Sequence, residues 1–275
     1  MGDFTRFAMN QITTGEQWSF RESIEGYAAQ DIRGVGVWRD RLLEHGVAEG
    51  AALLRDHGMQ VASYCFGGLF ADAVDGLLDE RVDDFKRMID EAAAIDAAAV
   101  VFLAGGLPED STDLSGAEGR ALEGLHRVIP HARDAGVTIG LEPLHPMTCA
   151  FRSILVNVDQ SLSWIERLGS PREVGIVFDT YALWWDPQIV PAIARAAGRI
   201  CAFHVSDWLR DTQDLRLDRG MMGDGCIDLK QLREAVEASG FDGWQEVEIL
   251  SERNWWKQDP VHITRVCVER FARYV

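Results

Sequence analysis

Short, nearly continuous apolar runs alternate along the chain with longer segments whose apolar residues recur every three or four positions. The short runs predict buried β-strands, and the longer segments, such as residues 82–95 and 229–238, predict amphipathic helices. Eight strands are expected, at residues 6–12, 32–38, 60–66, 97–103, 138–142, 174–179, 200–205 and 244–249. Eight strands that alternate with helices favour an α/β fold, a parallel sheet closed into one (βα)₈ TIM barrel domain over residues 1–275.

An open, doubly wound parallel sheet is the alternative fold. The turn that follows the first strand, residues 10–15, lacks the glycine-rich phosphate cradle of dinucleotide-binding sheets. The chain also contains no Walker, GxSxG or HExxH motif. The barrel is therefore the preferred interpretation.

Local signals mark where helices begin and end. Gly136 separates a helical segment from an apolar run, which is typical of a helix C-cap. Thr13 and Glu16 have the spacing of a capping box, and Asp259 before Pro260 predicts an N-cap followed by the first helical residue.

Charge and cysteine content argue against a protein that binds nucleic acid or membranes and against a disulfide-bonded secreted protein. The chain of 275 residues has 27 Lys and Arg against 44 Asp and Glu, a formal net charge of −17, which repels nucleic acid and anionic membranes. Residues 1–6 lack a hydrophobic signal region, and no apolar run is long enough to span a bilayer. The five cysteines are scattered and odd in number, which favours reduced thiols. We expect a cytoplasmic protein with no nucleic-acid or membrane partner.

Four consecutive predicted strands end in a residue that can bind a metal ion. They are Glu142, Asp179, His204 and Glu248. Active sites of such barrels lie at the C-terminal ends of the strands, and three carboxylates gathered there would repel one another without a cation between them. Three oxygen ligands and one imidazole suit Mn²⁺, Mg²⁺ or Co²⁺, with Zn²⁺ as a further alternative. Glu246 is an alternative to Glu248, which lies closer to the rim.

Five motifs along the chain, and the order in which they occur, resemble those of the sugar phosphate isomerase/epimerase family. This family belongs to the xylose isomerase-like barrel superfamily, with D-tagatose 3-epimerase, inosose dehydratase and endonuclease IV. The motifs are Leu141-Glu142-Pro143, Phe178-Asp179-Thr180-Tyr181, Phe203-His204-Val205-Ser206-Asp207-Trp208, Gly223-Asp224-Gly225-Cys226-Ile227-Asp228 and Val247-Glu248-Ile249.

The resemblance implies one bound divalent cation, with Mn²⁺ preferred, held by Glu142, Asp179, His204 and Glu248. It also implies that Glu142 and Glu248 exchange a substrate proton and that Arg219, ahead of the glycine turn, binds substrate oxygens. The sequence departs from close relatives at Ala182, where they often carry a histidine.

The expected enzyme is an isomerase or epimerase that moves an α-proton of a keto sugar through a metal-stabilised enediolate. His145 is either a loop histidine or a general acid. In the second case the enzyme would be a lyase or dehydratase acting on a 3-oxo sugar, a 3-oxo-glycoside (including C-glycoside cleavage) or a keto-inositol. Trp38 and Trp185 are expected to pack on the sugar, and Asp207 to contact it.

The expected partner is a small carbohydrate, and the chain could form a homo-oligomer or associate with a small second subunit. Two further alternatives are a nuclease like endonuclease IV, which the charge of −17 disfavours, and an idle sugar-binding or assembly subunit, which an intact ligand quartet disfavours.

Overall fold

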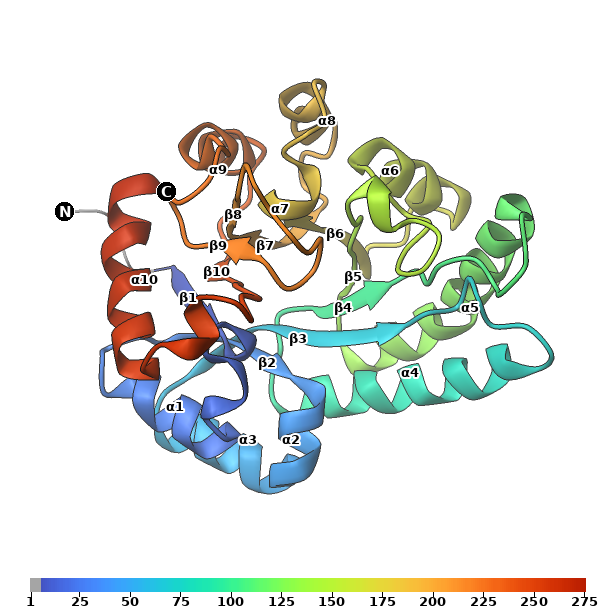
Figure 1. Cartoon of the computed structure of the whole chain (residues 1–275). Coiled ribbons are helices and arrows are strands. Elements are labelled where there is room, and N and C mark those ends of the chain that lie inside the picture. The colour runs from blue at the N-terminus through green and yellow to red at the C-terminus, as the bar shows by residue number, and fades with distance from the viewer. Residues whose placement is uncertain (1–5) are drawn as a thin grey trace.

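The computed structural model describes residues 6–275, and its centre is one closed barrel of eight parallel strands (Figure 1). The strands follow one another around the barrel in the order β1-β10-β7-β6-β5-β4-β3-β2. Their bounds are β1 Phe7–Asn10, β2 Gly34–Trp38, β3 Gln60–Gly68, β4 Val100–Leu103, β5 Ile139–Leu141, β6 Val174–Asp179, β7 Ile200–Val205 and β10 Gln245–Val247. The predicted barrel and the positions of its eight strands are confirmed.

Helices cover the outside of the barrel (Figure 1). The α-helices are α1 Phe20–Ala28, α2 Arg39–His45, α3 Val47–Asp56, α4 Leu77–Ala94, α5 Leu114–Ala135, α6 Val158–Arg167, α7 Thr180–Leu183, α8 Ile189–Arg195, α9 Leu229–Ala238 and α10 Pro260–Tyr274. Three short 3₁₀ helices lie in the loops: η1 Gln11–Gln17, η2 Pro146–Thr148 and η3 Trp255–Lys257. A two-stranded antiparallel sheet, β8 Asp207–Trp208 with β9 Arg219–Gly220, follows β7 and was not expected from the sequence.

Alternation along each strand decides which side chains enter the barrel. Val177 and Ala202 pack in the interior with Cys65 and Val101. Phe178, one residue further along β6, instead joins the main core between strands and helices. Polar residues that share the parity of Val177 and Ala202 therefore point into the barrel.

Two of the three helix-end signals behave as expected. Asp259 accepts a hydrogen bond from the His262 amide and caps α10, and Gly136 ends α5 in a left-handed conformation. The capping box at Thr13 is wrong, because the Thr13 hydroxyl donates to the Val247 carbonyl and accepts from the Ile249 amide. The capping box that forms is that of α1, at Ser19.

Within residues 6–275, no helix has the length and apolar character required to cross a membrane. The expectation that residues 1–6 contain no signal region concerns a segment of which only residue 6 is described.

Candidate metal centre

The four predicted ligands reach the same end of the barrel from neighbouring strands. Asp179 is the last residue of β6, and His204 is the last but one of β7. The two residues lie opposite each other where these strands pair. Glu142 and Glu248 directly follow β5 and β10, where their amides still bond to the Phe102 and Val205 carbonyls of adjacent strands. Regular parallel pairing therefore brings together side chains separated by more than a hundred residues.

Three of these side chains converge on one point. The His204 Nδ1 atom lies 3.2 Å from Glu142 Oε1 and 3.7 Å from Glu248 Oε2. The three possible ligand atoms all lie within 4.8 Å of one another, close enough to hold one metal ion. His204 is fully buried, and Glu142 and Glu248 are 7% and 6% exposed.

The electrostatics of this group fit a cation. Neither ring nitrogen of His204 has a hydrogen-bond partner among the described residues, although both are buried. Burial opposes a charged imidazole, but the carboxylates of Glu246, Glu248 and Glu142 outweigh it and raise the pKa of His204 to about 10. An imidazole surrounded by carboxylates with no hydrogen-bonding partner is the donor set expected of a metal-binding histidine.

Asp179, the fourth predicted ligand, pairs with Arg219. Its Oδ2 atom lies 3.1 Å from Arg219 Nη1, which is also 3.0 Å from Glu248 Oε2. Burial raises the pKa of Asp179, and the Arg219 guanidinium opposes that shift. The guanidinium of Arg219 also lies over the Tyr181 ring at 4.6 Å. Arg219 thus bridges the two carboxylates, and its predicted role in binding substrate stays a prediction.

Glu246 lies beneath this group and faces the other side of His204. Its Oε1 atom accepts hydrogen bonds from Asn10 Nδ2 at 2.6 Å and Ser63 Oγ at 2.9 Å, while its Oε2 atom lies 3.7 Å from His204 Nε2. Gly36 makes room for it, because a Cβ atom there would lie 1.8 Å from Oε1. This arrangement favours Glu248 over Glu246 as the ligand on the Nδ1 side.

Asn10 and Ser63 are site residues that the sequence did not reveal. Asn10 ends β1, where it also caps η1 and accepts a hydrogen bond from Trp38 Nε1 at 2.7 Å. Both residues are uncharged and belong to strands without a predicted ligand. The only signal that could have found them is their inward parity near the C-terminal strand ends.

His145 lines a small pocket together with Arg219 and packs against two tryptophans. The His145 ring stacks on Trp208 with centroids 4.8 Å apart and meets Trp185 edge-on at 5.9 Å. Its Nδ1 atom accepts a hydrogen bond from the Met147 amide, so the neutral ring carries its proton on Nε2. Burial lowers the pKa of His145. Trp38 lies beside Glu142 and Glu248 in the lining of the central pocket.

Asp207 has a structural role that the sequence did not predict. Its two oxygens accept four backbone hydrogen bonds, from the amides of Trp208, Gly223, Gly225 and Ile227. These bonds hold the glycine turn against β8, so the expectation that Asp207 contacts substrate finds no support in its surroundings.

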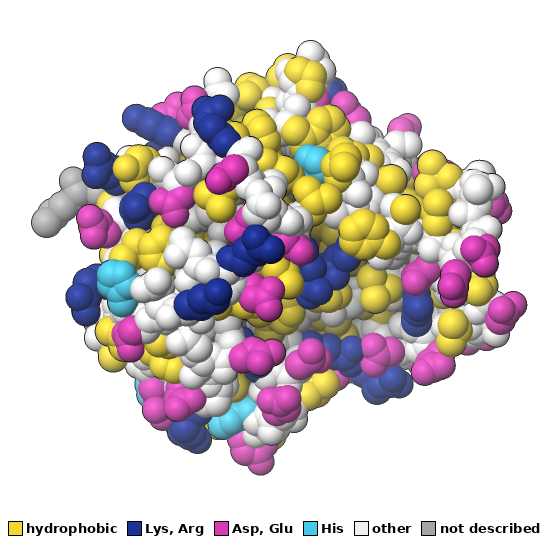
Figure 2. Space-filling model, viewed as in Figure 1, with side chains coloured by type: hydrophobic (Ala, Val, Ile, Leu, Met, Phe, Trp, Pro, Cys, Tyr) yellow, Lys and Arg dark blue, Asp and Glu magenta, His cyan; other side chains and the backbone are white. Residues whose placement is uncertain are grey.

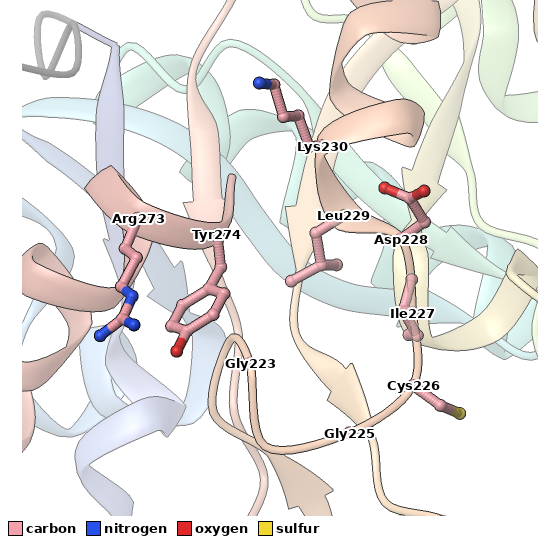
Figure 3. A pocket seen from close by; sticks show the side chains of 9 residues that line it. All are labelled: Gly223, Gly225, Cys226, Ile227, Asp228, Leu229, Lys230, Arg273 and Tyr274. Carbon is pink, nitrogen blue, oxygen red and sulfur yellow. The ribbon is translucent and has the colours of Figure 1, made fainter.

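A separate surface pocket lies between residues 223–230 and the end of α10 (Figure 3). Tyr274 lies beside the turn at Gly223, whereas the Lys230 side chain points away from it (Figure 3). None of the residues predicted for the metal centre lines this pocket.

The fold and the site together define a (βα)₈ barrel with a candidate metal centre at the C-terminal ends of its strands. The sequence profile described as xylose isomerase-like TIM barrel matches residues 23–266, and the chain belongs to this family. Protein SMc04130 from Sinorhizobium meliloti 1021 is 40% identical, with 98% of each chain covered and a TM-score of 0.95. A search of curated proteins finds no match.

Two more distant structures share the fold. The IolI protein with a bound zinc atom is 18% identical, with 98% of this chain and 99% of that chain covered and a TM-score of 0.84. The D-allulose 3-epimerase from Methylomonas sp., in complex with D-allulose, is 16% identical, with 98% and 97% covered and a TM-score of 0.79.

Proposed function

We propose that this protein is a divalent-metal-dependent sugar isomerase or epimerase that transfers an α-proton of a keto sugar. The observation that carries the proposal is the convergence of Glu142, His204 and Glu248 within 4.8 Å, with neither buried nitrogen of His204 hydrogen-bonded to any residue in 6–275. Relatives of the same fold support it, since one structure is an epimerase of a keto sugar and another contains zinc.

Glu142, Asp179, His204 and Glu248 would hold the ion, with Mn²⁺ as our first choice. A divalent ion supplies Lewis acidity, which makes the proton next to a ketone more acidic by stabilising the charge of an enediolate. For Asp179 to serve as a ligand, Arg219 must release Oδ2, the atom it now contacts at 3.1 Å. The freed guanidinium can then donate to substrate hydroxyl or carbonyl oxygens.

Glu142 and Glu248 are the proton carriers in this proposal. They follow β5 and β10, which are separated in the barrel by β6 and β7, so they approach the centre from different sides. One carboxylate removes the proton and the other returns it to the opposite face, as epimerisation requires.

His145 favours one second candidate, elimination from a 3-oxo sugar or its glycoside. His145 lines the same pocket as Arg219, and its Nε2 proton points away from the Met147 contact. A neutral imidazole with that proton can act as a general acid for a leaving group.

The test is to incubate metal-loaded protein with free, phosphorylated and 3-oxo keto sugars in D₂O and to follow the α-proton by NMR. Deuterium uptake without bond loss is expected for the isomerase or epimerase, and release of water or an aglycone would identify the lyase. Glu142→Gln should abolish uptake, whereas Glu173→Gln, a buried carboxylate paired with Arg133 away from the site, serves as the matched control. Full activity of metal-stripped protein would refute the proposal.

A further inference from the structure

Two arginines at the entrance to the metal centre form no ion pair within the described part of the chain. Arg152 follows η2, and Arg216 lies between β8 and β9. Together with Leu144 and Arg219 they line two adjoining small pockets, one of which also contains Glu142 and Glu248. Figure 2 shows Lys and Arg side chains beside a hollow near the middle of the face. The arginines thus lie where a substrate bound at the candidate metal centre would extend outward.

The guanidinium groups of Arg152 and Arg216 differ from that of the neighbouring Arg219 in having no carboxylate within ion-pair distance among the described residues. Arg219 contacts Asp179 and Glu248, but neither Arg152 nor Arg216 forms a side-chain hydrogen bond or an ion pair with any residue in 6–275. Other arginines without such contacts, such as Arg55, Arg210 and Arg265, are exposed, whereas Arg152 is half-buried. Arg39, by contrast, pairs with two carboxylates on α4.

The position of Arg152 makes its charge costly. The side chain is half-buried and its guanidinium lies over the Phe66 ring at 5.4 Å. Burial and the charges of Arg216 and Arg219 lower the pKa of Arg152, and the more distant carboxylates of Glu142 and Glu248 offset this only in part. A partly desolvated cation near another cation is unfavourable unless an anion offsets both. Arg216 is exposed, so it can move towards such an anion at little cost.

We infer that the substrate carries an anionic oxyacid group, a carboxylate or a phosphate ester, that binds between Arg152 and Arg216. This inference rests on the proposed function and specifies its substrate class. A guanidinium group can donate two parallel hydrogen bonds to the oxygens of a carboxylate or a phosphate. A neutral sugar hydroxyl can accept a hydrogen bond but carries no charge to neutralise the arginine. The acidic metal centre binds the reacting end, and the two arginines bind the anionic end.

Binding of inorganic phosphate to the metal-loaded protein, measured by calorimetry, gives a first test that needs no turnover. Arg152→Ala and Arg216→Ala should each weaken it about 10- to 100-fold. Arg55→Ala, an exposed arginine on α3, is the control and should leave binding unchanged. Equal binding by all four proteins would mean that phosphate binds elsewhere, for example at the metal, and would overturn the inference.

The second test compares deuterium uptake for a ketohexose, its terminal phosphate and the ketohexonic acid with a terminal carboxylate. Wild-type protein should prefer one of the two anionic compounds in kcat/KM, and which one it prefers distinguishes phosphate from carboxylate. The preference over the neutral ketohexose should fall about 10- to 100-fold in Arg152→Ala, mainly through KM. Arg152→Lys should restore part of it.

The outcomes separate this inference from the proposed function. Uptake by the neutral ketohexose with no anionic preference, and no effect of either arginine substitution, would overturn the inference and leave the proposed function in place. No uptake with any compound, with phosphate binding still dependent on Arg152 and Arg216, would refute the proposed function and support the anion site.

Discussion

Glu246 provides a sharp test of how the metal centre is built. Its carboxylate is 1% exposed, with Oε1 held by Asn10 and Ser63 and Oε2 directed at His204 Nε2. In the neutral ring that would bind metal, the negative carboxylate 3.7 Å from Nε2 favours the tautomer with its proton on Nε2 and leaves Nδ1, on the side of Glu142, free for the ion. Glu246→Gln keeps the size of the side chain but changes what it can offer to the ring.

The expected effect follows from the hydrogen bonds. The glutamine oxygen must stay near Asn10 Nδ2, which is 2.6 Å from the present Oε1, so the amide NH₂ turns towards His204. Two N–H groups would then face each other, and the ring relieves this by moving its proton to Nδ1, where it blocks the metal. Loss of such a supporting carboxylate typically costs 10- to 100-fold in metal affinity, or about 1.4–2.8 kcal/mol.

The assay is calorimetric titration of metal-stripped protein with Mn²⁺ and Zn²⁺, with thermal melting of the metal-free proteins as a check of folding. Glu248→Gln should lose more affinity than Glu246→Gln, since it removes a ligand, and Glu173→Gln should lose none. Wild-type affinity in Glu246→Gln, or a greater loss there than in Glu248→Gln, would refute the assigned roles of the two glutamates.

Four other predictions follow from the same contacts. Gly36→Ala should destabilise the protein by about 1–3 kcal/mol in chemical denaturation, because the new Cβ collides with the Glu246 carboxylate. Asp207→Ala removes an acceptor of four amides and should cost about 3 kcal/mol, with faster hydrogen exchange in the glycine turn. Metal binding at pH 7 should release about one proton, since the pKa of His204 is raised to about 10 before metal binds; calorimetry in two buffers of different ionisation enthalpy measures it. His145 should titrate by NMR below its unfolded pKa of 6.5, so its contribution to stability is complete above that pH and is lost as the pH falls through the lower value.

Each of these predictions has a result that would contradict it. Gly119→Ala, where a Cβ meets no atom within 4 Å on α5, is the control for Gly36→Ala and should be neutral or stabilising. Asp207→Asn keeps one oxygen acceptor and should lose less than Asp207→Ala; equal stability of Asp207→Ala and wild type would remove the structural role. Metal binding without proton release, or a His145 pKa at or above 6.5, would contradict the electrostatic reasoning.

The sequence predicted the barrel because each strand and helix carries its own periodic signal, and the order of these elements limits the topology. It predicted that Glu142, Asp179, His204 and Glu248 would meet because strand ends of a parallel barrel lie on one rim. The structure brings Glu142, His204 and Glu248 within reach of one ion and leaves Asp179 with Arg219. Which carboxylate pairs with which cation depends on side-chain distances that no strand pattern contains.

What local pattern could not reveal are the contacts between distant segments. Thr13 has the spacing of a helix cap, yet its hydroxyl bonds to Val247 and Ile249, more than 230 residues away. Arg152 and Arg216 lie in loops, where hydrophobic periodicity gives no direction for a side chain. The sequence by itself determined the barrel and the rim on which its acidic residues gather. Only the tertiary structure decided how Glu246 supports His204 and which arginines form no ion pair in residues 6–275, because both depend on closing the barrel and folding its loops over one end.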